Sequence, residues 1–189
     1  MNRNCGDCSL CCRLLPIRGM EKPANTRCQH QRHGKGCAVY GRVTAPPGAP
    51  KMPLECKLWS CRWLVDEGTV DLRRPDRSHY VLDVMPDFIT AQDGPEGEPI
   101  RIEALQVWVD PKHRDAHRDP ALRAYLAKAG ETGIVAIVRY GSKEGITLVP
   151  PILSGTGDWL EIASGVESEH SVEDMFDMER VKVVSTTKD

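Results

Sequence analysis

Eight cysteines are the residues of this sequence best suited to chemistry, and all lie within its first third. They are Cys5, Cys8, Cys11, Cys12, Cys28, Cys37, Cys56 and Cys61. Thiolates bind zinc and iron–sulfur clusters, and two-residue spacers let successive thiolates turn toward one centre. Cys5-x2-Cys8-x2-Cys11 has two such spacers in series. The pattern therefore predicts that all eight cysteines are metal ligands.

Disulfide bonding is the main alternative use of these cysteines. No stretch approaches the roughly 20 apolar residues that cross a bilayer, and the residues before Cys5 contain no apolar signal region. We therefore expect a cytoplasmic protein with no membrane association, in a compartment where thiols stay reduced. In that setting eight cysteines indicate metal rather than four disulfides.

The sequence leaves open which thiolates share a site. Side chains of the neighbours Cys11 and Cys12 diverge, so we expect the pair to serve different sites or to bridge. Eight thiolates suffice for two four-cysteine sites, for one [4Fe-4S] cluster plus one Zn, or for one cluster with four cysteines left over. The serial spacing favours an iron–sulfur cluster over zinc. Basic residues would offset the negative centre and lower thiol pKa values; the candidates are Arg3, Arg13, Arg18, Arg27, Lys57 and Arg62.

Histidines are the other possible ligands. His30 and His33 lie between two cysteines, and we expect them to face solvent because eight thiolates already satisfy two sites. His113 and His117 have the i, i+4 spacing that places two imidazoles on one helical face. Lys, Arg and Asp surround that pair, so a solvated surface is expected there. No nucleophile-and-base motif is present in the sequence, and no catalytic residue is predicted.

Two chemically distinct parts of the chain must position these residues. Residues 1–65 carry a formal charge of +8 and residues 66–189 one of −10. We expect 1–65 to form a cysteine-rich, metal-organised module, with a proline-rich loop over 45–53 and a short helix over 56–66. We expect 66–189 to form a small antiparallel sheet with one or two helices. The predicted fold class is thus α+β.

Local patterns in the second part predict its elements. Alternating apolar residues indicate strands near 80–85, 88–90 and 100–109, with a turn at 93–97. Asp119-Pro120 and a later glycine indicate a helix over 120–130. Residues 134–140 and 146–149 are typical of a β-hairpin. A further helix is predicted from Ser171 toward Val181.

The ordered cysteines resemble a known family, the CxxCxxCC (YkgJ-like) zinc- or iron-chelating bacterial proteins. The resemblance covers all eight cysteine positions, in the segments Cys5-Gly6-Asp7-Cys8-Ser9-Leu10-Cys11-Cys12, Cys28, Gly36-Cys37-Ala38-Val39-Tyr40 and Cys56-Lys57-Leu58-Trp59-Ser60-Cys61. Where that family has Arg-Pro after the tyrosine, this chain has Arg42-Val43 and a longer loop. A related module occurs in flagellin lysine methylases, where the resemblance implies an iron–sulfur cluster.

Three functions compete on this basis. The favoured one is a non-enzymatic metal-binding protein, holding an iron–sulfur cluster or zinc and acting with a protein partner. The alternative is a redox or accessory factor for a protein-modification enzyme, using an exposed [4Fe-4S] cluster. Nucleic-acid binding through the basic residues 1–65 is not expected, because bound thiolates cancel part of that charge and the remaining chain is acidic.

Overall fold

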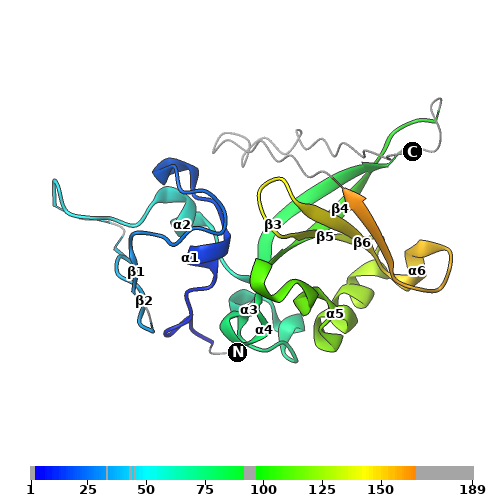
Figure 1. Ribbon diagram of the computed structural model, residues 1–189, viewed down its shortest axis with the longest axis horizontal. Helices are drawn as coiled ribbons and strands as arrows, with labels where there is room; N and C mark the ends of the chain where they lie inside the picture. Colours follow the sequence, from blue (N-terminus) through cyan, green and yellow to red (C-terminus); the bar gives the residue numbers. More distant parts are fainter. Residues whose placement is uncertain (1–2, 33, 43, 45, 92–96, 165–189) are drawn as a thin grey trace.

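The centre of the molecule is a five-stranded sheet (Figure 1). The computed structural model describes residues 3–32, 34–42, 44, 46–91 and 97–164. The strands lie in sequence order across the sheet: β3 (Tyr80–Ala91), β4 (Ile100–Val109), β5 (Val135–Arg139), β6 (Gly145–Val149) and β7 (Leu160–Ser164). All neighbouring pairs are antiparallel except β4 and β5, which are parallel.

The α+β class is confirmed, but the expectation of a wholly antiparallel sheet is wrong for this one pair. Between β4 and β5 the chain passes through the 3-10 helix η3 (Pro111–Arg118) and helix α5 (Pro120–Gly130). A parallel neighbour requires a crossover of this kind, because the chain must travel back before it can run in the same direction. Helix α5 begins as predicted, with the Asp119 carboxylate accepting the Ala121 N–H at 2.9 Å.

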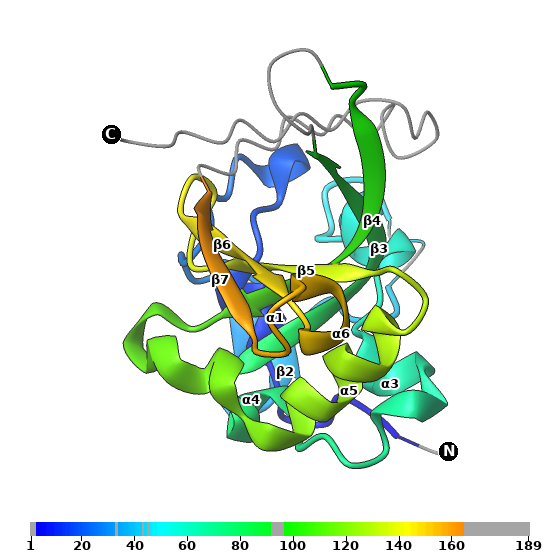
Figure 2. The ribbon, with the colours of Figure 1, turned by 90° about the vertical axis from the view of Figure 1, so that its right-hand side faces the viewer.

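Helix α5 covers one face of the sheet and forms the main core with it (Figure 2). Leu122 and Leu126 of the helix are buried, and they belong to the same cluster as Leu105, Val107 and Val138 of β4 and β5. Alternate residues of a strand share a face. The intervening residues of β4 and β5 therefore point to the opposite side of the sheet.

The cysteine-rich part of the chain packs on that opposite side. Val81 and Trp108 are buried there in a second cluster with Leu10, Leu14 and Cys61. Figure 1 shows this part of the chain beside the sheet, with few regular elements. These elements are α1 (Cys11–Leu14), η1 (Arg18–Met20), the antiparallel ribbon β1 (Gln31–Arg32) with β2 (Gly36–Cys37), α2 (Leu54–Leu58) and α3 (Arg62–Val65). Then follow η2 (Glu67–Thr69) and α4 (Pro75–Ser78).

The single helix predicted over 56–66 is instead two short helices, α2 and α3. Trp59 and Cys61 between them have extended backbones, with ψ near 140° and 129°. Cys61 forms an isolated antiparallel bridge with Asp83 of β3. A backbone paired to a strand cannot continue a helix, so this tertiary contact overrides the local helical spacing.

The strand predictions need two further corrections. The two runs near 80–85 and 88–90 form one strand, β3, with an irregularity between Leu82 and Pro86. Strand β7 was not predicted. It follows helix α6 (Pro151–Ser154) after a short loop and pairs with β6. The predicted helix at 171–181 and most of the turn at 93–97 lie outside the described residues. Of the helices described, none has the length and apolar character to cross a membrane.

Candidate metal centre

The segment that carries the first four cysteines is a tight turn followed by helix α1. The Cys8 N–H donates to the Cys5 carbonyl at 2.8 Å, and Gly6 between them has a φ of 52°. Helix α1 begins at Cys11. Successive residues of a helix are rotated by about 100°, so Cys11 and Cys12 leave the backbone in different directions.

Cys5, Cys8, Cys11 and Cys61 line one small pocket, and we call them the first set. The rest of the pocket wall is apolar or aromatic, formed by Trp59, Trp63, Leu64, Pro75 and Val81. Three of the thiols come from the CxxCxxC turn, whereas Cys61 arrives from much later in the chain. The structure therefore gathers four sulfurs that no local pattern could place together.

Contacts to Asp83 hold the Cys61 segment on strand β3. The Trp59 indole N–H donates to the Asp83 carboxylate at 2.6 Å, and Arg62 Nε donates to the Asp83 carbonyl at 2.8 Å. The Asp83 carboxylate also accepts the Met85 N–H at 2.9 Å. Burial raises the pKa of Asp83 to about 6, although these hydrogen bonds oppose the shift.

Cys12, Cys28, Cys37 and Cys56 form the second set. Cys28 donates its backbone N–H to the Cys12 carbonyl at 3.1 Å. Burial is the first cause that raises the pKa of Cys56, and the charges of the other three cysteines of this set come next. The charges of Cys12 and Cys28 also raise the pKa of Cys37. The charges of these four thiols thus act on one another, and those of Cys12 and Cys37 also act on Cys5, so the second set adjoins the first.

Gly36 brings the ribbon that carries Cys37 against the turn of the first set. Its φ is 76°, and a Cβ at this position would lie only 2.7 Å from the Gly6 carbonyl oxygen. A side chain here would meet both the steric cost of positive φ and a backbone clash. Glycine is therefore required where the two sets adjoin.

The buried side chain of Lys22 adds a cation beside the second set. Its ammonium donates to three backbone carbonyls, those of Arg13, Leu15 and Pro23. Burial lowers the Lys22 pKa, and the charges of several thiols, Cys28 first among them, oppose this shift. The three carbonyls hold the ammonium in place, so its charge stays near the thiols of the second set.

Most of the thiols are harder to ionise than an exposed cysteine. Burial is the largest cause of a raised pKa at Cys5, Cys8, Cys37, Cys56 and Cys61. At Cys56 and Cys61 the pKa reaches about 12. A metal ion bound at these positions would have to displace protons, because the thiolate is the form that ligates metal.

Cys11 and Cys12 share a hydrogen bond with opposite effects on the two thiols. This bond raises the pKa of Cys11 well above its ordinary value, and burial adds to the rise. The same bond lowers the pKa of Cys12 to about 7, with the charge of Lys22 assisting. Cys12 is therefore the member of this pair that ionises more readily.

The prediction of which basic residues offset the charge of the thiols is partly wrong. Arg3 donates to the Trp63 carbonyl at 2.7 Å, Arg13 pairs with Asp110, and Arg62 binds the backbone of Asp83. Arg74 takes part of this role, because its charge opposes the rise that burial causes in the pKa of Cys5 and Cys8.

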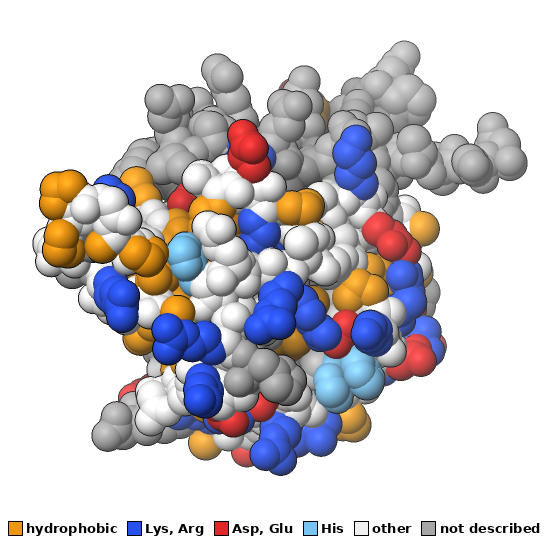
Figure 3. Space-filling model, turned by 60° about the vertical axis from the view of Figure 1, so that its left-hand side comes forward, with side chains coloured by type: hydrophobic (Ala, Val, Ile, Leu, Met, Phe, Trp, Pro, Cys, Tyr) orange, Lys and Arg blue, Asp and Glu red, His pale blue; other side chains and the backbone are white. Residues whose placement is uncertain are grey.

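Arg74 is anchored at this place by two carboxylates. It pairs with Asp7 at 2.8 Å, inside the first CxxC, and with Asp76 at 2.6 Å. Lys and Arg side chains are numerous on the cysteine-rich face of the molecule (Figure 3). General basic character was thus visible in the sequence, whereas the particular cations depend on tertiary contacts.

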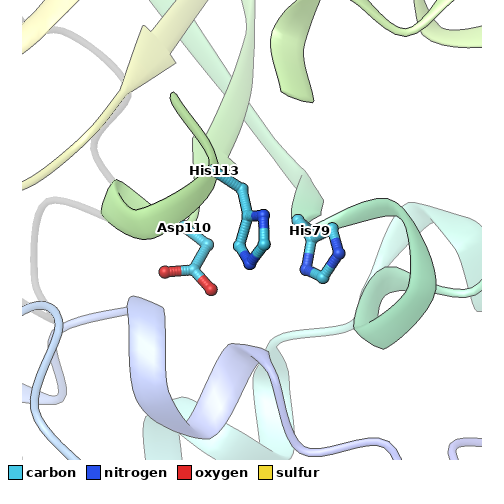
Figure 4. A group of neighbouring side chains, drawn as sticks. All are labelled: His79, Asp110 and His113. Carbon is cyan, nitrogen blue, oxygen red and sulfur yellow. The ribbon is translucent and has the colours of Figure 1, made fainter. Parts of the chain in front are cut away.

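The ligand atoms of His79, Asp110 and His113 all lie within 4.8 Å of one another (Figure 4). Among the described residues, it is the one group of three or more possible metal ligands whose ligand atoms lie this close together. Among the described residues, no three cysteine sulfurs lie within this distance of one another. Tetrahedral Zn–S bonds of about 2.3 Å would place sulfurs roughly 3.8 Å apart, so zinc would draw each set together.

Strand pairing explains the histidine and aspartate group, which the sequence analysis missed. Tyr80 of β3 pairs with Val109 of β4, so the residues just outside this pair, His79 and Asp110, are also neighbours. The Asp110 N–H donates to the His79 carbonyl at 2.9 Å. His113 follows on η3, and its ring stacks on that of His79 with centroids 3.7 Å apart.

The expectation of a solvated surface holds for His113 but is wrong for His117. His113 is exposed, whereas His117 is 3% exposed. His117 Nδ1 lies 2.7 Å from the Arg114 carbonyl and 3.1 Å from the Tyr140 hydroxyl. His30 is half-buried and donates its backbone N–H to the Cys28 sulfur at 3.4 Å, while His33 lies outside the described residues.

Comparisons with known proteins do not supply a relative. No protein-family model matches the chain, and no curated protein or solved structure matches it.

Proposed function

We propose that this chain is a metal-binding protein in which eight cysteine thiolates hold an iron–sulfur cluster or zinc in two four-cysteine sets. The observation that carries the proposal is the convergence of Cys61 with Cys5, Cys8 and Cys11 on one pocket. Four thiols directed at a common space are a donor set for soft or borderline metals. The resemblance of the cysteine spacing to the CxxCxxCC proteins supports the same function.

An iron–sulfur cluster is the occupant that we favour for the first set. Each thiolate of a four-iron cluster binds a different iron, so the sulfurs stand further apart than around a single zinc ion. No three cysteine sulfurs of the described residues lie within 4.8 Å of one another, which is compatible with the wider arrangement. The apolar and aromatic wall of the first set would also shield a cluster from water.

The bound metal would stabilise the N-terminal third of the chain. The regular elements there are short: α1 has four residues, and each strand of the ribbon has two. Such pieces are marginal without tertiary support. Sulfur–metal bonds would join segments that otherwise meet through one modest hydrophobic cluster, so metal binding and folding of this part should be coupled.

Metal analysis of anaerobically purified protein tests this function. We expect iron with matching acid-labile sulfide and a broad visible absorption; bound zinc without colour would assign the ion instead. A chelator should then remove metal and secondary structure together. Colourless, metal-free protein that keeps its circular dichroism in chelator would contradict the proposal.

Single serine substitutions distinguish the two sets. Cys61→Ser should remove the centre of the first set, and Cys56→Ser that of the second, each leaving the other centre in place. Ser60→Ala, adjacent to Cys61, is the matched control and should keep the full metal content. Unchanged metal content in both cysteine variants would exclude the proposed ligand sets.

A further inference from the structure

A second kind of ligand group lies at the end of the β3–β4 pair, apart from the eight thiols. His79, Asp110 and His113 offer two imidazole nitrogens and one carboxylate oxygen. In Figure 4 the three side chains face one another, with His113 between the other two. Imidazole and carboxylate together suit Zn²⁺ and Fe²⁺, and three protein ligands are the number found in metal sites that keep open positions.

The donor atoms of this group are available for a ligand. Among the described residues, no hydrogen-bond partner occupies a ring nitrogen of His79 or His113, whose rings stack on each other. The Asp110 carboxylate accepts the Lys112 N–H at 3.1 Å and pairs with Arg13. A carboxylate has about four acceptor positions, so Asp110 retains capacity to bind a metal ion while these contacts fix its direction.

The backbone at His79 is held in an uncommon conformation. Its φ is 64°, one of three positive values at non-glycine residues among those described. The left-handed region costs a non-glycine residue about 1 kcal/mol, and such outliers concentrate at functional sites. Here the conformation ends α4 and turns the imidazole toward His113.

The two histidines line an open hollow, whereas Asp110 is buried and does not line it. This open hollow has a volume of about 810 Å³. Four basic side chains and two carboxylates also line it, so the charge of its wall is positive on balance; these are Arg73, Lys112, Arg114, Arg118, Asp115 and Asp119. A metal ion held by the three ligands would therefore have open positions toward a solvent-filled, basic space, where oxygen anions are the favoured additional ligands.

We propose that His79, Asp110 and His113 bind one divalent transition-metal ion, through two imidazole nitrogens and one carboxylate oxygen, independently of the cysteine thiolates. Binding requires a rotation of the stacked rings so that one nitrogen of each points at the ion. The inference does not depend on the function proposed for the cysteines. The thiolates prefer the same ions, so the test must report on imidazoles directly.

Zinc titration followed by NMR of ¹⁵N-histidine provides that report. The full chain is used after its thiolate-bound metal has been measured, and Zn²⁺ is then added in steps. We expect two imidazole signals to shift together and to saturate with one added equivalent. Zinc uptake without any imidazole shift would mean that the ion has gone to thiolates alone, and it would overturn the proposal.

Two variants and one control locate the site. His113→Gln changes an exposed side chain and should leave the fold intact, while weakening this zinc binding by at least ten-fold. Asp110→Asn should weaken it as well. Asp115→Asn makes the same carboxylate-to-amide change on η3, outside the group, and should leave the affinity unchanged. Equal affinity in His113→Gln and the parent protein would overturn the proposal, even if the thiolate metal content were as expected.

Discussion

Cys61 and Asp83 pair through an isolated β-bridge that joins the cysteine-rich part of the chain to the central sheet. Asp83 is only 6% exposed, and its carboxylate accepts hydrogen bonds from the Trp59 indole and the Met85 N–H. A proposed metal ligand is thereby positioned by a residue of the sheet, 22 positions later in the sequence. Contacts at Asp83 should therefore affect both stability and metal content.

Trp59→Phe tests this relationship. The change keeps an aromatic ring but removes the indole donor, which leaves the buried Asp83 carboxylate with fewer hydrogen bonds. A lost partner of a buried polar group costs about 1–3 kcal/mol, so we expect urea unfolding to shift by that amount and metal retention to fall. Trp159→Phe, the same change at a half-buried site away from the cysteines, should retain metal normally. Normal metal retention in Trp59→Phe would show that Asp83 does not position Cys61 through this bond.

Gly36→Ala should disrupt the junction of the two cysteine sets. Its Cβ would approach the Gly6 carbonyl to 2.7 Å, and its φ of 76° is unfavourable for alanine. We expect a loss of metal content and a fall in Tm. Gly34→Ala is the control, since Gly34 also has a positive φ, 63°, but a Cβ there meets nothing within 4 Å. An equal effect of both substitutions would attribute the loss to backbone conformation alone.

Asp87 and Arg139 form an ion pair inside the molecule, at 2.9 Å and with both side chains fully buried. Removal of one partner leaves an uncompensated buried charge, which costs about 3–5 kcal/mol. We expect Arg139→Met to destabilise the protein by that amount in urea unfolding. The double variant Asp87→Leu/Arg139→Met should be more stable than Arg139→Met alone. A purely additive double variant would argue against coupling between the two charges.

Protonation of Glu161 should make the protein less stable in acid. Burial raises its pKa, but hydrogen bonds from Arg118 and Arg123 outweigh this effect and lower the value to about 2, from 4.5 in an unperturbed glutamate. Because the folded pKa is depressed, the stabilisation is complete above pH 4.5 and is lost as the pH falls toward 2.

Urea unfolding at pH 6 and pH 3 checks this contribution. Glu161→Gln should reduce stability at pH 6 and should lose less stability than the parent protein between the two pH values. Glu144→Gln is the control, because Glu144 pairs with Arg114 at an exposed position where ion pairs contribute little. Parallel pH profiles for the parent and Glu161→Gln would contradict the assignment.

Sequence patterns predicted the locally encoded part of the fold. Asp119-Pro120 marked the start of α5, and alternating apolar residues marked β4, because capping and strand periodicity depend on neighbours in the chain. The break at Cys61 was not predictable in this way, since a bridge to a distant strand decides it. The parallel pairing of β4 and β5 likewise depends on how α5 packs.

The candidate sites, like the fold, were predictable only where neighbours in the sequence decide the structure. Cysteine type and spacing were sufficient to nominate eight thiols, but not to divide them into sets, because Cys61 and Cys56 reach different partners through the tertiary fold. His79 and Asp110 are far apart in the sequence, and only the register of β3 and β4 makes them neighbours. The one sequence feature that pointed toward this group was the position of Asp110 directly after a predicted strand.

The placement of Cys11 and Cys12 on one turn of α1 has a consequence for how this chain can vary in length. One residue inserted before Cys11 would rotate the turn by about 100°, so Cys11 would take the direction that Cys12 has now and Cys12 would point a further 100° away. Insertions and deletions should therefore be excluded from the CxxCxxCC segment. The exposed residues 46–51 can absorb them, because a longer surface loop costs little entropy.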